Sequence, residues 1–184
     1  MNQKIQTVLQ EIENFSKENG NPYWIITHET GEFLNKLIRE NNFKKVVEIG
    51  TSIGYSGIWI AEALSHTGGK LYTVESHEKR YQTAHENFTK VGVENLVIQL
   101  KGHAPDVPVN DMIDLLFLDA TKVEYISYLT AFLFHMKKGG LIIADNALTH
   151  EKELADYKKH IFNSPQLESQ LLKIGNGLFF SKII

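Results

Sequence analysis

Five short apolar runs, separated by segments long enough for a helix, constrain what this chain can fold into. The runs are rich in Val, Ile and Leu and occupy residues 44–49, 71–76, 96–102, 113–120 and 140–146. Strands that are apolar throughout are typical of parallel sheets buried on both faces. Helices are expected between them, over residues 56–63, 77–91 and 123–136. This alternation predicts an α/β fold: a Rossmann-like sheet with helices on both faces and right-handed crossovers.

Two helices are expected before the first strand. Apolar side chains recur at helical spacing from Ile5 to Phe15, which predicts an amphipathic helix that ends near Gly20. A second helical pattern covers residues 29–40 and would start at Thr27 or His28. We expect residues 1–42 to form N-terminal helices that cover the site.

The end of the chain departs from the alternation. Two strand-like runs, at 170–175 and 178–184, are separated by Asn176-Gly177, a strong signal for a hairpin. Strands this close together must pair antiparallel. Because no repeat or linker is visible, we expect residues 1–184 to form one domain, whose sheet ends in an antiparallel hairpin.

Composition excludes several classes of function. The 184 residues include no cysteine, so disulfide frameworks, thiolate zinc sites and cysteine nucleophiles are ruled out. The net charge is −3 and no basic run occurs, so a nucleic-acid partner is not suggested, although it is not excluded. The polar N-terminus does not resemble a signal peptide, and no apolar run reaches the roughly 18 residues that span a bilayer. We therefore expect a cytoplasmic protein without a membrane partner.

The first strand leads into a glycine-containing turn that opens a helix. Gly50 and Gly54 allow a ligand to approach the backbone closely, but the dinucleotide fingerprint G-x-G-x-x-G is absent. Glu48, two residues before the first glycine, would repel a pyrophosphate and can accept hydrogen bonds from a cationic ligand or its network. A sulfonium cofactor therefore fits this turn better than a nicotinamide dinucleotide.

Two further segments suit a nucleoside. Glu75 ends the second predicted strand, where a carboxylate can accept hydrogen bonds from both ribose hydroxyls. Its alternative role is to favour the N-terminus of the next helix through the helix dipole. His103 and Ala104 follow the third strand and would lie near an adenine, although a loop histidine is more often simply exposed.

Polar side chains also follow the fourth and fifth strands. Asp119, Asp145 and Asn146 should meet at the carboxyl edge of adjacent parallel strands, with Lys122 nearby. Two carboxylates and one amide oxygen suit Mg²⁺, and also Mn²⁺ or Ca²⁺. Singly, each of these residues would more often cap a loop. As a set that includes a lysine, they favour a metal site.

Together these residues resemble the cation-dependent O-methyltransferase family, which includes catechol O-methyltransferase, the caffeoyl-coenzyme A O-methyltransferases and many small bacterial relatives. The matching segments are ETGEFL at 29–34, VEIGT at 47–51, GYS at 54–56, DA at 119–120 with Lys122 and Tyr125, DN at 145–146, and IGNGL at 174–178. The resemblance implies a class I methyltransferase sheet of seven strands with the last strand antiparallel.

The resemblance also implies roles for individual residues. The expected contacts to S-adenosylmethionine are Glu48, Gly50, Thr51, Gly54, Ser56, Glu75, His103, Ala104 and Asp119. The expected ligands of a divalent cation are Asp119, Asp145 and Asn146, and Lys122 matches the family's catalytic base. A cation bound to a substrate hydroxyl lowers the pKa of that hydroxyl, so an adjacent lysine can take its proton.

Three features depart from the family's pattern. Thr121 stands where relatives commonly carry a second aspartate, so one contact near the cofactor is weaker or replaced. The segment after Asn146 lacks the aromatic residue or arginine followed by glycine that is often found there, which predicts a different substrate rim. The region before the first strand is shorter than in many relatives. This favours an open site or one completed by a second subunit, and the resemblance implies a homodimer.

These features bear on four functions. The first is a metal-dependent O-methyltransferase that acts on a small, catechol-like hydroxylated aromatic compound. The second keeps the chemistry but methylates a hydroxylated uridine in tRNA, and the negative net charge argues against it. The third is an S-adenosylmethionine-binding protein without catalysis, which would need neither Lys122 nor the cation ligands. A nicotinamide-dependent oxidoreductase is the fourth, and the turn after the first strand argues against it.

Overall fold

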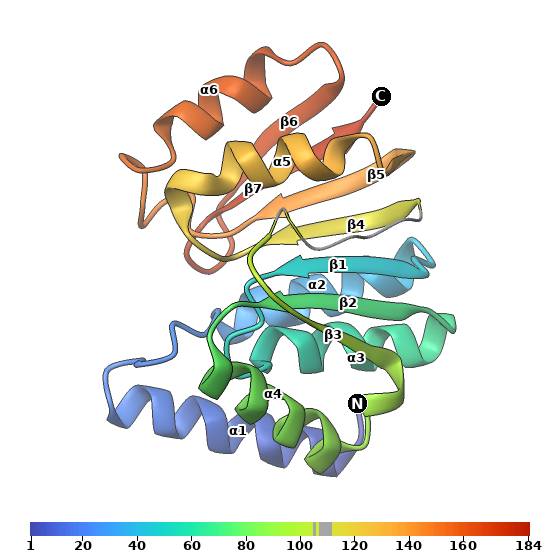
Figure 1. Cartoon of the computed structure of the whole chain (residues 1–184), viewed down its shortest axis with the longest axis vertical. Helices are drawn as coiled ribbons and strands as arrows, with labels where there is room; N and C mark the ends of the chain where they lie inside the picture. Colours follow the sequence, from blue (N-terminus) through green and yellow to red (C-terminus); the bar gives the residue numbers. More distant parts are fainter. Residues whose placement is uncertain (105, 107–111) are drawn as a thin grey trace.

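The computed structural model describes residues 1–104, 106 and 112–184, and one mixed sheet runs through its centre (Figure 1). Its strands are β1 (Lys45–Ile49), β2 (Lys70–Glu75), β3 (Val97–Lys101), β4 (Ile113–Leu118), β5 (Met136–Ala144), β6 (Leu167–Leu172) and β7 (Leu178–Ile183). Their order is β3-β2-β1-β4-β5-β7-β6, and β7 runs antiparallel to both neighbours. The predicted seven-stranded α/β sheet with an antiparallel last strand is confirmed.

Helices cover both faces of this sheet. They are α1 (Gln3–Glu18), α2 (His28–Glu40), α3 (Tyr55–Thr67), α4 (Glu78–Val91), α5 (Tyr125–Leu133) and α6 (Ala155–Asn163), with 3₁₀ turns at Glu94–Leu96 and Lys122–Glu124. Alternate strand residues belong to two separate apolar clusters. Val46 and Leu115 pack with α1 to α4, whereas Val47 and Leu116 pack with α5 and α6. This is the two-sided burial expected from strands that are apolar throughout.

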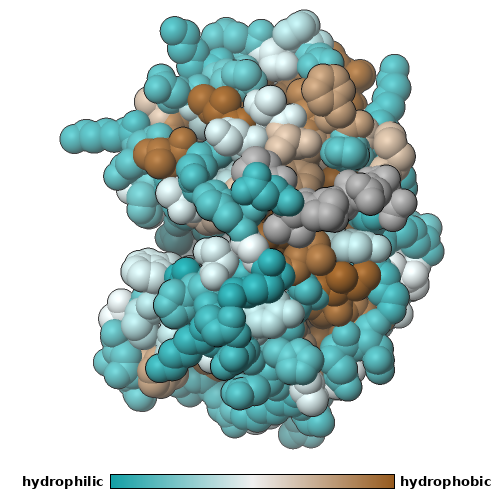
Figure 2. Space-filling model, in the orientation of Figure 1, coloured by the Kyte–Doolittle hydropathy of each residue, from teal (hydrophilic) through white to brown (hydrophobic). Residues whose placement is uncertain are grey.

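The outer surface carries few large apolar side chains. The face seen in Figure 2 is mostly hydrophilic, with apolar residues gathered in a few patches. Among the described residues, the most exposed large apolar side chains include Phe134, Val123 and Trp24. Trp24 is the one that lines a cavity described below. None of the described helices is long and apolar enough to cross a membrane.

The starts of α2 and α3 follow from local backbone chemistry. Thr27 caps α2, because its hydroxyl accepts a hydrogen bond from the Thr30 amide, as expected for a helix beginning here. The turn after β1 carries positive φ angles at Gly50 (106°), Ser52 (47°) and Gly54 (84°). Such angles bend the chain sharply from strand to helix, and glycine tolerates them at little steric cost.

Three elements differ from the sequence predictions. The helix expected over 123–136 ends at Leu133, because residues from Met136 onward extend β5 and pair with β4. Helix α6 was not predicted: it has no side-chain cap, and only Tyr157 and Ile161 are buried within it. The hairpin pairs antiparallel as expected, but Leu172 pairs with Leu178, so its connection spans 173–177 instead of two residues.

Candidate functional site

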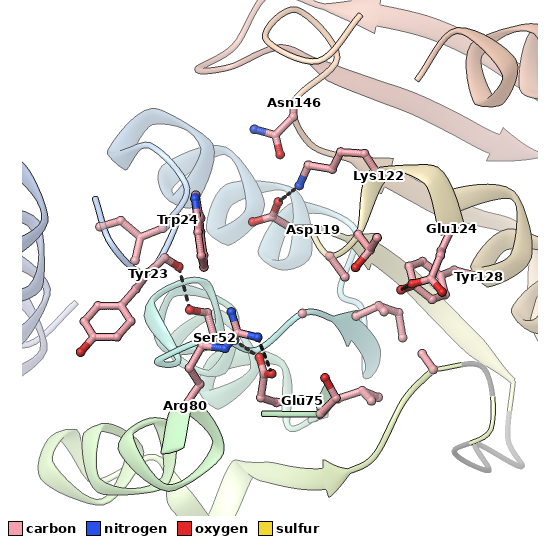
Figure 3. Close-up of a pocket in the computed structure, with 18 of the residues that line it drawn as sticks. Tyr23, Trp24, Ser52, Glu75, Arg80, Asp119, Lys122, Glu124, Tyr128 and Asn146 are labelled. Carbon is pink, nitrogen blue, oxygen red and sulfur yellow. Dashed lines mark hydrogen bonds and ion pairs between the residues drawn. The ribbon is translucent and has the colours of Figure 1, made fainter. Parts of the chain in front are cut away.

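A cavity of about 530 Å³ lies at the carboxyl ends of the parallel strands, where ligands bind in open α/β sheets. It brings together seven residues that the sequence had assigned to the site: Gly50, Glu75, His103, Ala104, Asp119, Lys122 and Asn146. Five others are buried and are not among the lining residues: Glu48, Thr51, Gly54, Ser56 and Asp145. Figure 3 shows that the lining side chains come from segments far apart in the sequence.

Several lining residues had no predicted role. They are Asn21, Tyr23, Trp24 and Ile25 between α1 and α2, Ser52, Arg80, Glu124, Thr149, His150 and Asn176. Ser52 lies in the glycine-containing turn and Asn176 in the hairpin signal, but neither pattern predicts a side chain in the cavity. The others reach it through the packing of the segments that carry them. Thr121, the departure from the family's pattern, also lines the cavity. Tyr125 is fully buried and donates a hydrogen bond to the Leu118 carbonyl, so packing is its role here.

At one end of the cavity, Glu75 is held in a fixed orientation. Its Oε2 accepts a hydrogen bond from the Ser52 amide (2.9 Å), and its Oε1 accepts one from the His77 amide (2.8 Å). Arg80 forms an ion pair with Oε1 at 3.2 Å, and the Nε atom of Arg80 is buried without a partner. A carboxylate held in this way at the end of β2 is suited to receive ribose hydroxyls.

Glu48 lies beneath the turn after β1. Its Oε2 accepts a hydrogen bond from the Thr73 hydroxyl at 2.6 Å, and its Oε1 is buried without a hydrogen-bond partner. The pKa of Glu48 is raised to about 7, chiefly by burial and also by the Asp119 and Glu75 carboxylates, although the Ser56 and Thr73 hydroxyls oppose the shift. A positive charge bound near this buried carboxyl group would favour its ionised form.

We expect Glu48→Gln to stabilise the ligand-free protein above neutral pH. The folded-state pKa lies above the ordinary value of 4.5, so the stability linked to the Glu48 proton is present below pH 4.5. It is lost as pH rises through about 7, because the folded state must then ionise a buried group. Urea unfolding at a series of pH values should show that, above neutral pH, the free energy of unfolding of the variant exceeds that of the wild type by about 1–3 kcal/mol.

Glu62→Gln serves as the matched control for this pH series. Glu62 is also buried, and although burial acts to raise its pKa, hydrogen bonds from Asn35 and His66 lower it on balance. Its substitution should therefore cost stability above the ordinary glutamate pKa. Parallel curves for Glu48→Gln and the wild type across the series would contradict the prediction.

At the other end of the cavity lie Asp119, Lys122 and Asn146, and the buried Asp145 directly precedes Asn146; these four residues are called the polar corner. The Lys122 ammonium donates a hydrogen bond to Asp119 Oδ1 at 2.9 Å, and it lies 5.6 Å from the centre of the Tyr125 ring. In Figure 3 the side-chain oxygen of Asn146 is turned towards this pair. The Asn146 amide nitrogen faces Thr149 Oγ1 at 3.4 Å. Asp145, directly before Asn146, is 1% exposed.

At this corner two carboxyl groups face one ammonium group, so their negative charges are not fully neutralised when both are ionised. Burial raises the pKa of Asp119 to about 6, against the opposing effect of Lys122. Burial and the neighbouring Asp119 charge raise the pKa of Asp145 to about 7, and Asp145 Oδ1 has no hydrogen-bond partner. Within the described part of the chain, no three His, Cys, Asp or Glu side chains are grouped as a metal site. A cation held here would therefore take its third protein oxygen from Asn146, and the unpartnered Asp145 oxygen fits such a group.

One wall of the cavity is an aromatic side chain held in a strained conformation. Trp24 has a φ of 49° and is 71% exposed, which is unusual for a bulky residue. The Arg80 guanidinium lies 5.9 Å from its ring centre. The segment is fixed by Asn21, whose side chain bonds both backbone groups of Ile25, and by Ser52, which donates to the Tyr23 carbonyl. In Figure 3 the indole is seen nearly edge-on, with one face towards Asp119 and Lys122.

Nearly the whole chain matches one family of known proteins. The family model described as O-methyltransferase matches residues 2–184. A flavonoid 3',5'-methyltransferase of Vitis vinifera is 29% identical, over 85% of this chain and 78% of its own length. A catechol O-methyltransferase of Niastella koreensis is 33% identical, over 77% of this chain and 66% of its own.

Solved structures share the fold. The O-methyltransferase from Bacillus cereus, crystallised in complex with SAH, superposes with a TM-score of 0.85 at 24% sequence identity. The match covers 97% of this chain and 91% of that one. It confirms the architecture, including the antiparallel strand β7.

Proposed function

This chain belongs to the O-methyltransferase family and is therefore an S-adenosylmethionine-dependent O-methyltransferase, and we propose that it methylates one hydroxyl of a small, catechol-like compound with the help of a divalent cation. One observation carries the proposal: the Lys122 ammonium contacts the Asp119 carboxyl group at one corner of the cavity, close to the buried Asp145, and burial raises the pKa of both carboxyl groups. Groups with perturbed pKa values that converge in a cleft are characteristic of catalytic sites.

Each end of the cavity has its own part in the reaction. Glu75 would receive the ribose of S-adenosylmethionine, with His103 and Ala104 near the adenine. Glu48, Gly50, Thr51, Gly54 and Ser56 would shape and support the turn beneath the methionine part. Asp119, Asp145 and Asn146 would hold the cation, which lowers the pKa of a hydroxyl in its reach. Mg²⁺ suits these oxygen ligands best, and Mn²⁺ or Ca²⁺ would also fit.

In its neutral amine form, Lys122 would take the hydroxyl proton at Nζ and become an ammonium. The oxygen of the acceptor then forms a bond to the methyl carbon, the bond between that carbon and the sulfonium breaks, and its electron pair stays on sulfur. The products are a methyl ether and S-adenosylhomocysteine. The walls of the cavity contribute mainly by holding the two reactants in line.

The aromatic wall favours a flat acceptor. The exposed face of Trp24 looks across the cavity towards Asp119 and Lys122, so a ring stacked on it would bring its hydroxyls to that corner. The backbone strain at Trp24 is consistent with a functional position. No observation specifically favours a uridine in tRNA as the acceptor, and the homodimer stays a prediction.

Methyl transfer to a panel of catechols tests the proposal. We expect turnover of labelled S-adenosylmethionine with Mg²⁺, loss of turnover with excess EDTA, and recovery when Mg²⁺ is restored. Monophenols of similar size serve as matched controls, because they lack the second hydroxyl and should react far more slowly.

Two results would overturn parts of this proposal. Full activity in EDTA would remove the cation from the mechanism. Binding of S-adenosylmethionine with no transfer to any catechol would exclude this acceptor class and direct the same assay to tRNA.

A further inference from the structure

Asn146 is held in a conformation that its own side chain does little to stabilise. Its φ of 71° lies in the left-handed region, and its side-chain contact to Thr149 is long, at 3.4 Å. Asparagine adopts this backbone more readily than most other residues with a side chain, so the φ angle is compatible with Asn146, and the bonds on either side of it decide where the residue lies. On its N-terminal side, the Asp145 amide donates to the Leu118 carbonyl within the sheet (3.0 Å).

The constraint on its C-terminal side comes from the hairpin connection, residues 173–177. The amides of Ala147 and Leu148 donate to the carbonyls of Gly177 and Asn176, both at 2.9 Å. These two bonds follow Asn146 directly in the chain. The short segment that carries Asn146 is thus fixed to β4 before it and to the hairpin connection after it.

Gly177 makes this contact possible. Its φ is 84°, and a Cβ atom at this position would overlap the Leu148 side chain and lie 2.7 Å from the Leu148 amide nitrogen. Since the nearest backbone atom belongs to the segment after Asn146, any larger residue must push that segment away. The connection is itself anchored, because the Gly175 amide donates to Glu29 Oε2 on α2 at 2.9 Å.

We propose that the hairpin connection 173–177, through Gly177, is a positioning element that sets the place of the Asn146 side-chain oxygen at the polar corner formed with Asp119, Lys122 and Asp145. This inference rests on the proposed function, in which Asn146 holds the cation. The same arrangement makes Glu29, which does not line the cavity, a positioning residue that acts through Gly175 and the connection. Residues that orient a metal ligand typically change metal affinity by about 10–100-fold.

The test measures Mn²⁺ binding to the otherwise ligand-free protein by calorimetry. Gly177→Ala should weaken Mn²⁺ binding by about 10–100-fold, while affinity for S-adenosylmethionine changes less than about threefold. Gly139→Ala is the matched control: its φ is 79°, close to that of Gly177, but a Cβ there meets nothing within 4 Å. It should leave Mn²⁺ binding unchanged. Equal Mn²⁺ affinity in the two glycine variants would overturn the inference.

A second pair of variants covers the case in which Gly177→Ala does not fold. Glu29→Ala removes the acceptor that holds Gly175 and adds no bulk, so it should weaken Mn²⁺ binding, whereas Glu29→Gln keeps an acceptor oxygen and should restore it. Asn146→Ala distinguishes a failure of the positioning role from a failure of the proposed function. If it weakens Mn²⁺ binding but the Gly177 and Glu29 variants do not, only the positioning role falls. If the wild type binds no Mn²⁺, the proposed function falls and the positioning role falls with it.

Discussion

Replacing Lys122 by methionine is expected to lower kcat for methyl transfer by about 10²–10⁴-fold, the range typical of a lost general base. Methionine keeps an unbranched chain in the cavity but offers no nitrogen that can accept the proton of the hydroxyl. Affinity for S-adenosylmethionine should change little, because Glu75 and the turn after β1 lie at the other end of the cavity. Single-turnover kinetics with labelled cofactor, together with binding by calorimetry, measure both quantities.

Two further variants define what the lysine does. Lys122→Arg keeps a positive charge beside Asp119, but a guanidinium stays protonated and cannot act as a base, so it should be nearly as inactive as the methionine variant. Lys101→Met is the control, since Lys101 forms an ion pair with Glu78 and does not line the cavity. Near wild-type turnover in Lys122→Arg would show that charge alone is needed and would end the assignment of Lys122 as the base.

Gly50→Ala is expected to destabilise the protein more than the other substitutions proposed here. The φ of Gly50 is 106°, and a Cβ atom there would overlap the Asp119 carbonyl oxygen and lie 2.8 Å from the Asp119 carbonyl carbon. Both atoms belong to the backbone where β4 ends, so they cannot move aside without shifting the polar corner. Backbone strain and overpacking together should lower the free energy of unfolding by about 2–5 kcal/mol. Urea unfolding gives this value, and calorimetry should show weaker binding of S-adenosylmethionine.

Gly92→Ala separates strain from collision. Gly92 ends α4 with a φ of 77°, and a Cβ there meets nothing within 4 Å. Its substitution should cost about 1–2 kcal/mol and leave cofactor binding intact. A Gly50 variant no less stable than the Gly92 variant would mean that the turn after β1 can relax away from Asp119.

The site could be predicted from sequence only where strand ends carry it. Glu75, Asp119 and Asn146 each follow an apolar run, so the parallel sheet alone brings them to one edge, and all three line the cavity. Trp24, Arg80 and Asn176 could not be found in this way, because packing of the α1–α2 connection, α4 and the hairpin brings them there. Glu48 differs from these residues: its motif predicted a ligand contact, the fold buries it beneath the turn, and the contact stays a prediction.

The sequence by itself determined the family, the seven-stranded sheet and the set of strand-end polar residues. The spacing of apolar residues and the positions of glycines indicate strands, helices and turns locally, before any tertiary contact forms. Only the tertiary structure decided the pKa values of Asp119 and Asp145, because burial and mutual repulsion exist only after the strands pair. It also decided the length of the hairpin connection and its contact with the segment after Asn146. That contact joins two segments that are far apart in the sequence, and no local sequence pattern predicts it. It forms only because the tertiary packing brings the two segments together.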